Sequence, residues 1–129
     1  MITFTVLGAP VPKGRPRVVA RRRKGGGMFP VAITPERTVQ WEQAVRRAAE
    51  QARITPMTGP VRLTCAFFLP TRRRVDIDNL GKAVMDALNG IAFADDSQVF
   101  ELATSKRLDA KAPRVVVGLW PCEGWEPAQ

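Results

Sequence analysis

The stretch VRLTCAFFLPTRRRVDIDNLGKAVMDALNG (residues 61–90) decides the fold, because its hydrophobic period changes along it from two residues to about 3.6. Large apolar residues alternate through its first part, which predicts a strand that ends at Pro70. From Leu80 onward the apolar positions share one helical face, which predicts a helix over residues 79–89 that stops at Asn89-Gly90. A buried strand therefore runs through a basic turn into an amphipathic helix.

The flanking segments extend this pattern in both directions. We expect a first strand over residues 2–8, a helix over 35–53, and two last strands over 99–108 and 113–120 that pair as a hairpin. The expected order is β-α-β-α-β-β, an α+β (mixed α/β) fold with a small mixed sheet of about four strands and two main helices. A chain of 129 residues fits one domain over residues 1–129, with an irregular tail over 121–129.

A basic segment follows the first strand. Residues 9–30 contain repeated prolines and glycines, so they predict a long flexible loop or a loose hairpin with Gly25-Gly26-Gly27 at its tip. The chain has a net charge of +8, and residues 1–35 hold seven bases and no acid. These bases are Lys13, Arg15, Arg17, Arg21, Arg22, Arg23 and Lys24. Such an asymmetry is typical of a polyanion binder, although a solubilising charged loop explains an isolated basic run about as well.

Composition excludes several kinds of chemistry. The chain has no histidine, and Cys65 and Cys122 lack metal-ligand spacing, so a zinc site and histidine-based triads are excluded and a disulfide is not expected. No apolar run approaches the roughly 18 residues that span a bilayer, and the first residues do not resemble a signal peptide. We therefore expect a cytoplasmic protein, without a membrane partner, whose chemistry depends on carboxylates, lysine or a bound ion.

Asp76 and Asp78 are separated by one residue directly before the predicted helix. In an extended stretch their side chains point the same way, and two adjacent carboxylates favour a hard divalent ion such as Mg²⁺ or Mn²⁺ between them. The alternative is that Asp78 caps the helix while Asp76 pairs with an arginine. Asp95 and Asp96 form a second acidic pair in a turn, where aspartates are also common for purely structural reasons. If the next strand lies beside residues 61–69, this turn can approach Asp76.

Lys82 lies on the same predicted helical face as Asp78 and about 6 Å along the axis, within reach of a phosphate held at Asp78. An ordinary ion pair between neighbouring turns is the simpler reading of Lys82. Asp86 lies too far along the helix to bind the same ion, and we interpret it as a partner for Lys82 or a solvated charge.

The segment RRRVDIDNLGKAVMDALNGIAFADDSQV (residues 72–99) resembles the central motif of the RusA family of Holliday-junction resolvases. It contains basic residues, D-x-D-N-L, a lysine four residues after the second aspartate, a short helix and D-D-x-Q-V. The similarity extends more loosely to the first strand, the basic loop and the helix TPERTVQWEQAVRRAA, so it covers most of the chain.

This resemblance implies a homodimeric, Mg²⁺-dependent endodeoxyribonuclease that nicks four-way DNA junctions symmetrically in recombination and repair. Mn²⁺ is expected to substitute, and no organic cofactor is implied. The implied catalytic residues are Asp76, Asp78, Asp96 and Lys82, with Asp95 as a further metal-binding carboxylate and Asn79 as an accessory group. DNA phosphates would contact the basic segment of residues 13–24 and the arginines Arg72, Arg73 and Arg74.

Two other functions remain open from the sequence. The chain could be a basic nucleic-acid-binding module without catalysis, in which the acids only pair with arginines. It could also be a related metal nuclease that acts on other branched or replication DNA.

Overall fold

A computed structural model describes residues 1–122 of the chain. Its main body is one four-stranded sheet in the order β1-β6-β4-β5, with a separate two-stranded sheet of β2 and β3. The strands are β1 (Ile2–Leu7), β2 (Arg17–Arg22), β3 (Met28–Ile33), β4 (Val61–Leu69), β5 (Val99–Leu108) and β6 (Arg114–Pro121). The helices are α1 (Glu36–Gln51), α2 (Ile77–Leu88) and the short 3-10 helix η1 (Asp96–Gln98). The predicted α+β fold is confirmed.

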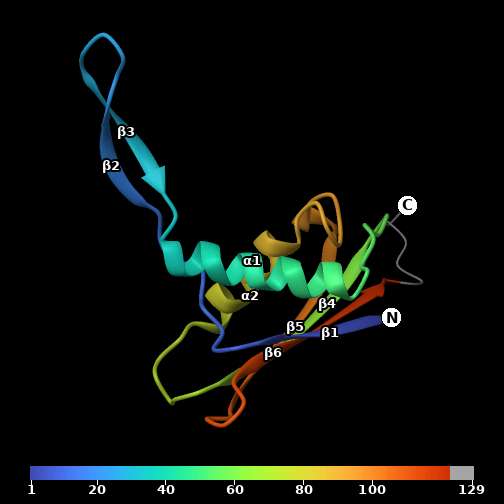
Figure 1. Cartoon of the computed structure of the whole chain (residues 1–129). Coiled ribbons are helices and arrows are strands. Elements are labelled where there is room, and N and C mark those ends of the chain that lie inside the picture. Colours follow the sequence, from blue (N-terminus) through green and yellow to red (C-terminus); the bar gives the residue numbers. More distant parts are fainter. Residues whose placement is uncertain (123–129) are drawn as a thin grey trace.

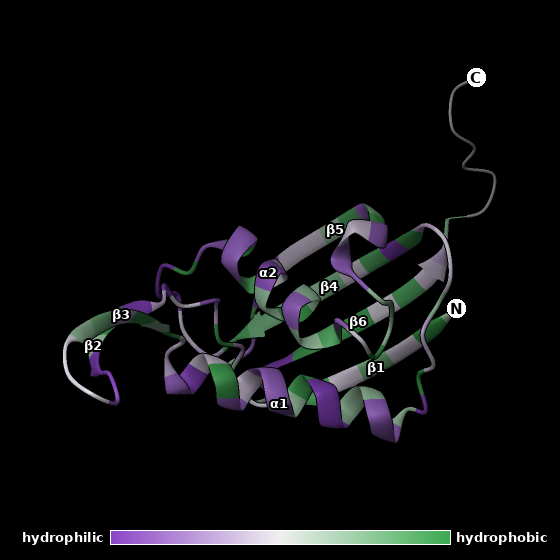
Figure 2. Ribbon diagram, turned by 90° about the horizontal axis from the view of Figure 1, so that it is seen from above, coloured by the Kyte–Doolittle hydropathy of each residue, from purple (hydrophilic) through white to green (hydrophobic). Residues whose placement is uncertain are grey.

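The two long helices lie on one face of the sheet (Figure 1). Along β4 the odd-numbered side chains are buried beneath them, while the even-numbered ones face the opposite side. The core combines β4 with the apolar faces of both helices, and its fully buried residues include Val45, Val61, Leu63, Phe67, Leu80, Val84 and Leu88. Figure 2 shows hydrophilic and hydrophobic residues alternating along α1, in keeping with a helix that buries one side only. In residues 1–122 no helix is long and apolar enough to cross a membrane.

The predicted pairing of the last two strands is wrong. β4 lies between them: β5 pairs with β4 in parallel, and β6 pairs with β4 in antiparallel orientation. The connection from β4 through α2 to β5 is a helical crossover, which joins parallel strands. β6 then covers the other edge of β4, so that the most apolar strand is hydrogen-bonded on both sides.

The basic segment forms a hairpin that projects from the body (Figure 1). β2 and β3 pair from Arg17 opposite Ile33 to Arg22 opposite Met28, within and beyond the predicted loop of residues 9–30. The glycines Gly25, Gly26 and Gly27 at its tip all adopt positive φ, which explains their presence there. At the other end of the chain, Pro121 ends β6, and the rest of the predicted tail, residues 123–129, lies outside the described residues.

Candidate active site

The first acidic pair lies at the beginning of α2. The helix begins at Ile77, two residues earlier than predicted, so Asp76 rather than Asp78 occupies the N-cap position and Asp78 lies in the first turn. The sequence predicted that both carboxylates lie in one extended stretch. This prediction is wrong, because Asp78 already belongs to the helix. Asp76 makes no side-chain capping hydrogen bond, and its Oδ2 lies 3.5 Å from Nδ2 of Asn79. Both acids are exposed at the start of the helix.

Asp76 lines an open hollow of about 550 Å³ together with basic and amide side chains. The other lining residues are Pro12, Lys13, Arg74, Val75, Asn79 and Lys106. Arg74 is one of the three predicted phosphate-binding arginines, and Arg72 and Arg73 are exposed in the same turn between β4 and α2. Bases and one acid of the predicted site thus surround a single hollow.

The sequence did not single out Lys106, which lies on β5. Its Nζ donates a 2.8 Å hydrogen bond to the carbonyl oxygen of Val75, the residue before Asp76. The parallel pairing of β5 with β4 brings this lysine beside the start of α2, and no local sequence signal identifies that pairing. Lys106 therefore positions the backbone that carries the first aspartate.

Lys13 has a different environment from the one predicted for it. Its Nζ lies 2.8 Å from Oε1 of Glu42 and 3.0 Å from Oδ2 of Asp86, and its backbone N–H donates to the carbonyl oxygen of Asn79. Partial burial acts to lower the pKa of Lys13, but hydrogen bonds to both carboxylates outweigh it and raise the pKa. Lys13 therefore fastens the chain to α1 and α2, and Asp86 is its partner rather than a partner for Lys82.

The second acidic pair is built around η1. Asp95 is the N-cap of this turn: its Oδ2 accepts a 3.1 Å hydrogen bond from the backbone N–H of Ser97, and hydrogen bonding from Ser97 lowers the pKa of Asp95. Gln98 completes a capping box and also donates to the carbonyl oxygens of Met57 and Gly59. Asp95 and Gln98 thus hold the turn, while the half-buried Asp96 in the same turn is left out of the cap.

The two acidic pairs lie toward opposite ends of β5. β5 does lie beside β4, as the sequence allowed, but the strands are parallel and Val99 pairs with Val61 at the start of β4. Asp96 lies just before Val99, at the start of β5. Asp76 lies just after Val75, which is bonded to Lys106. Val99 and Lys106 are seven positions apart on β5, or about 20 Å at 3.3 Å per residue. Within residues 1–122 no three acidic, cysteine or histidine side chains lie close enough together to hold one ion.

The donor set itself suits a hard cation, since it consists of carboxylates without nitrogen or sulfur ligands. Asp76 and Asp78, with one residue between them, supply two such carboxylates at one helix start. In a single described chain the third one, from Asp96, is not beside them. Carboxylates that suit a divalent ion are therefore present, and within residues 1–122 they are not gathered at one place.

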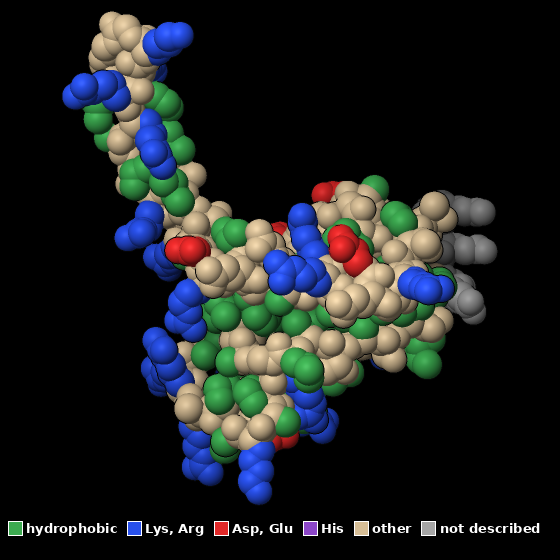
Figure 3. All heavy atoms as spheres, viewed as in Figure 1, with side chains coloured by type: hydrophobic (Ala, Val, Ile, Leu, Met, Phe, Trp, Pro, Cys, Tyr) green, Lys and Arg blue, Asp and Glu red, His purple; other side chains and the backbone are tan. Residues whose placement is uncertain are grey.

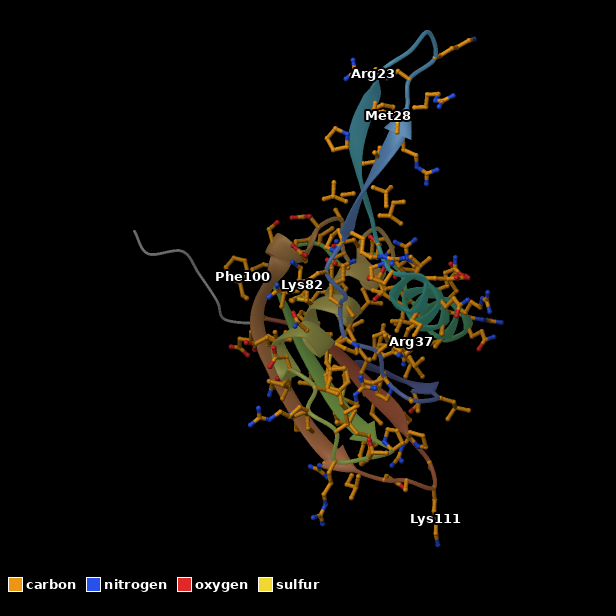
Figure 4. All side chains as sticks on the ribbon, turned by 90° about the vertical axis from the view of Figure 1, so that its left-hand side faces the viewer. Arg23, Met28, Arg37, Lys82, Phe100 and Lys111 are labelled. Atoms are coloured by element: carbon orange, nitrogen blue, oxygen red, sulfur yellow. The ribbon has the colours of Figure 1, made fainter. Side chains whose placement is uncertain are left out.

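Exposed bases extend from this region onto the hairpin. In Figure 3, Lys and Arg side chains occur along the hairpin and down the adjoining side of the body. The hairpin and the segment before it carry Arg15, Arg17, Arg21, Arg22, Arg23 and Lys24, all of them exposed. Figure 4 shows Arg23 far out on the hairpin and Lys82 on the body, where Lys82 is exposed on α2. A long basic surface thus leads to the predicted site residues.

A family model and two known proteins each match most of the chain. Residues 8–119 match the family model described as endodeoxyribonuclease RusA. The chain is 34% identical to the uncharacterized protein YqaN of Bacillus subtilis (strain 168), over 90% of this chain and 93% of that protein. It is 29% identical to the crossover junction endodeoxyribonuclease RusA of Aquifex aeolicus (strain VF5), over 87% of this chain and 85% of that protein.

Proposed function

Because the chain belongs to the RusA endodeoxyribonuclease family, we propose that it is a divalent-metal-dependent endonuclease that resolves four-way DNA junctions by paired nicks. The observation that carries the proposal is the pair Asp76 and Asp78 at the start of α2, beside a hollow lined by Arg74 and Lys106. Acids repel phosphate and bases attract it. The two occur together where a cation lies between the carboxylates and the phosphate. The paired nicks require two copies of the chain, so a homodimer is part of the proposal.

Asp76 and Asp78 are the residues that would hold the ion, with Asp96 as a further carboxylate. A bound Mg²⁺ or Mn²⁺ would supply Lewis-acid activation of the phosphate and of the attacking water. Asn79 orients the Asp76 carboxylate through its side-chain amide, and Lys106 fixes the adjoining backbone. Asp95 supports Asp96 by holding the turn.

Lys82 stabilises negative charge on the phosphate as it develops. It lies one helical turn after Asp78 and is exposed, so its ammonium group can reach a phosphate at the helix start. The exposed bases of the hairpin and Arg72 to Arg74 contact neighbouring phosphates, which positions the DNA without reading its sequence. Lys13 is left out of this set because Glu42 and Asp86 already neutralise it.

The test compares nicking of a labelled four-way junction with nicking of a plain duplex, a fork and a single strand, each with Mg²⁺ and with EDTA. We expect nicking of the junction in Mg²⁺, little of the duplex, and none in EDTA. Equal cutting of the duplex would reject junction selectivity, and preferential cutting of the fork would favour a nuclease for replication DNA. Binding without nicking under any divalent ion would favour the non-catalytic module, which the incomplete ligand set of one chain also favours.

A further inference from the structure

A second pocket lies beside the hollow that Asp76 lines. It has a volume of about 360 Å³ and is formed by the segment after β1, the first turn of α1, and the end of β4 with the turn that follows it. Its lining shares Pro12, Arg74 and Val75 with the hollow at Asp76, so the two cavities adjoin along one wall. Ligand pockets in proteins measure about 300–1,000 Å³. A pocket near the lower end of that range suits a ligand about as large as one nucleotide.

The charged side chains of this pocket are all basic. Arg37 of α1 and Arg73 and Arg74 of the turn between β4 and α2 line it, and among residues 1–122 no acid does. Arg37 lies on the body of the molecule rather than on the hairpin (Figure 4). Within residues 1–122 none of the three is in an ion pair, whereas two carboxylates neutralise the neighbouring Lys13. Three uncompensated guanidinium groups attract an anion, and their planar fork matches phosphate.

The rest of the wall is mainly apolar. Pro10 and Leu69 are buried, and Pro12, Pro70 and Val75 are half-buried, so their carbon atoms form an uncharged surface inside the pocket. An inorganic anion makes no use of such a wall. A nucleobase does, because its faces are flat and apolar, and guanidinium planes stack on bases as well as bind phosphates. The pocket therefore offers contacts to both parts of one nucleotide.

A base cannot enter this pocket while it is paired in a duplex. Neighbouring bases cover both of its faces there, and its partner covers its edge, so it must first leave the stack. The free-energy cost of this step is least for a base that is already unpaired. Pairing is interrupted where strands exchange at a branch point, so a nucleotide there enters at a lower cost than one in a plain duplex.

We propose that this pocket binds one unpaired nucleotide of the DNA, next to the phosphate that is cut. Arg37 and Arg73 hold the nucleotide against the apolar wall, and Arg74, which lines both cavities, contacts the phosphate between the pocket and Asp76. The inference rests on the proposed function and gives it a cause of substrate selectivity. Branched DNA supplies the nucleotide that the pocket takes, and a fully paired duplex does not.

Binding is measured by fluorescence anisotropy in EDTA, so that the result does not depend on nicking. The probes are a duplex with one extra, unpaired nucleotide, the same duplex with an abasic residue at that place, and the fully paired duplex. We expect the wild type to bind the duplex with the extra base about tenfold more tightly than the one with the abasic residue, as the stacking of one base predicts. Equal affinity for these two probes would overturn the proposal and leave an anion site only.

Two variants, each with a matched control, assign this preference to the pocket. Arg37→Gln removes one guanidinium group, and Ala9→Leu adds bulk at an exposed position of the lining. Both should abolish the preference for the extra base. Arg47→Gln and Ala52→Leu make the same changes at exposed positions in and directly after α1, outside the lining, and should keep it. A preference that survives both pocket variants would overturn the assignment.

Nicking then locates the nucleotide relative to the cut. Once the cuts in a four-way junction are mapped in Mg²⁺, single abasic residues are placed at the nucleotides that flank them. We expect the nicking rate to fall about tenfold at one of these positions, and Arg37→Gln to remove this dependence on position. Equal nicking at every abasic position would overturn the proposal and leave the proposed function standing. A wild type that prefers the extra base but nicks no DNA would instead refute the proposed function and leave the binding of an unpaired nucleotide standing.

Discussion

The two acidic pairs on either side of α2 look alike in the sequence but have different structures. Asp76 and Asp78 begin a twelve-residue helix, and neither carboxylate caps it. In the second pair, Asp95 caps a three-residue turn and only Asp96 is left out of the cap. Neighbouring acids are therefore not equivalent: hydrogen bonds decide which carboxylate caps the backbone and which one has no capping role.

The largest expected effect is at the first pair. Asp76→Asn should lower the rate of metal-dependent nicking more than about a hundredfold, because even groups behind a metal ligand are worth about 10- to 100-fold. Binding to a four-way junction, measured by gel shift, should be kept or strengthened because a negative charge is removed. Nicking at the wild-type rate would show that this carboxylate is not a ligand.

In the second pair, the same substitution can be compared at Asp95 and at Asp96. Asp96→Asn should abolish nicking, whereas Asp95→Asn should retain most of it, since asparagine caps a helical turn about as well as aspartate. Single-turnover nicking rates at saturating Mg²⁺ measure the difference. Equal losses in the two variants would remove the distinction between an ion-binding and a capping aspartate.

A smaller effect concerns stability at Gln98. Its side chain bonds to the backbone of Ala94, Met57 and Gly59, so Gln98→Ala should lower the free energy of unfolding by about 1–3 kcal/mol. Urea denaturation measures this change. Gln40→Ala, an exposed position on α1 bonded only to Glu36 among the contacts found, is the control and should change stability by less than about 0.5 kcal/mol.

The smallest effect is a pH dependence at Asp95. Hydrogen bonding from Ser97 lowers the pKa of Asp95, so its contribution to stability is present above the ordinary aspartate pKa of about 3.9 and is lost as the pH falls through the folded-state value. The difference in melting temperature between the wild type and Asp95→Ala should therefore shrink between pH 6 and pH 3. A difference that grows on acidification would contradict this assignment.

Local patterns predicted the elements well, because α1, β4 and α2 each bury one face with a regular period. The pairing of strands was harder to predict. Adjacent strands in the sequence favour a hairpin, but β5 and β6 instead flank β4, since the most apolar strand gains partners on both sides. The helix start was misplaced by two residues because Asp76 and Asp78 are both good capping residues.

The candidate site was predicted in part. Exposed basic residues and the first acidic pair follow from composition and spacing, and Arg74 and Asp76 do line one hollow. Lys106 and the ion pairs of Lys13 could not be predicted, because they depend on which strand lies parallel to β4 and on how α1 crosses α2. The assignment of Asp76, Asp78, Asp96 and Lys82 to catalysis remains a proposal.

The ion pairs of Lys13 also determine how the projecting hairpin is mounted. The segment leading into it is attached to Asn79 and Asp86 of α2 through Lys13, and to Thr38 of α1 through the N–H of Gly14. If the hairpin binds DNA as proposed, a force on it would reach α2 through these contacts at Asn79 and Asp86. The hairpin and the helix that carries Asp78 and Lys82 thus share one attachment point, so a DNA shape that bends the hairpin would, under the proposed function, also act on the start of α2.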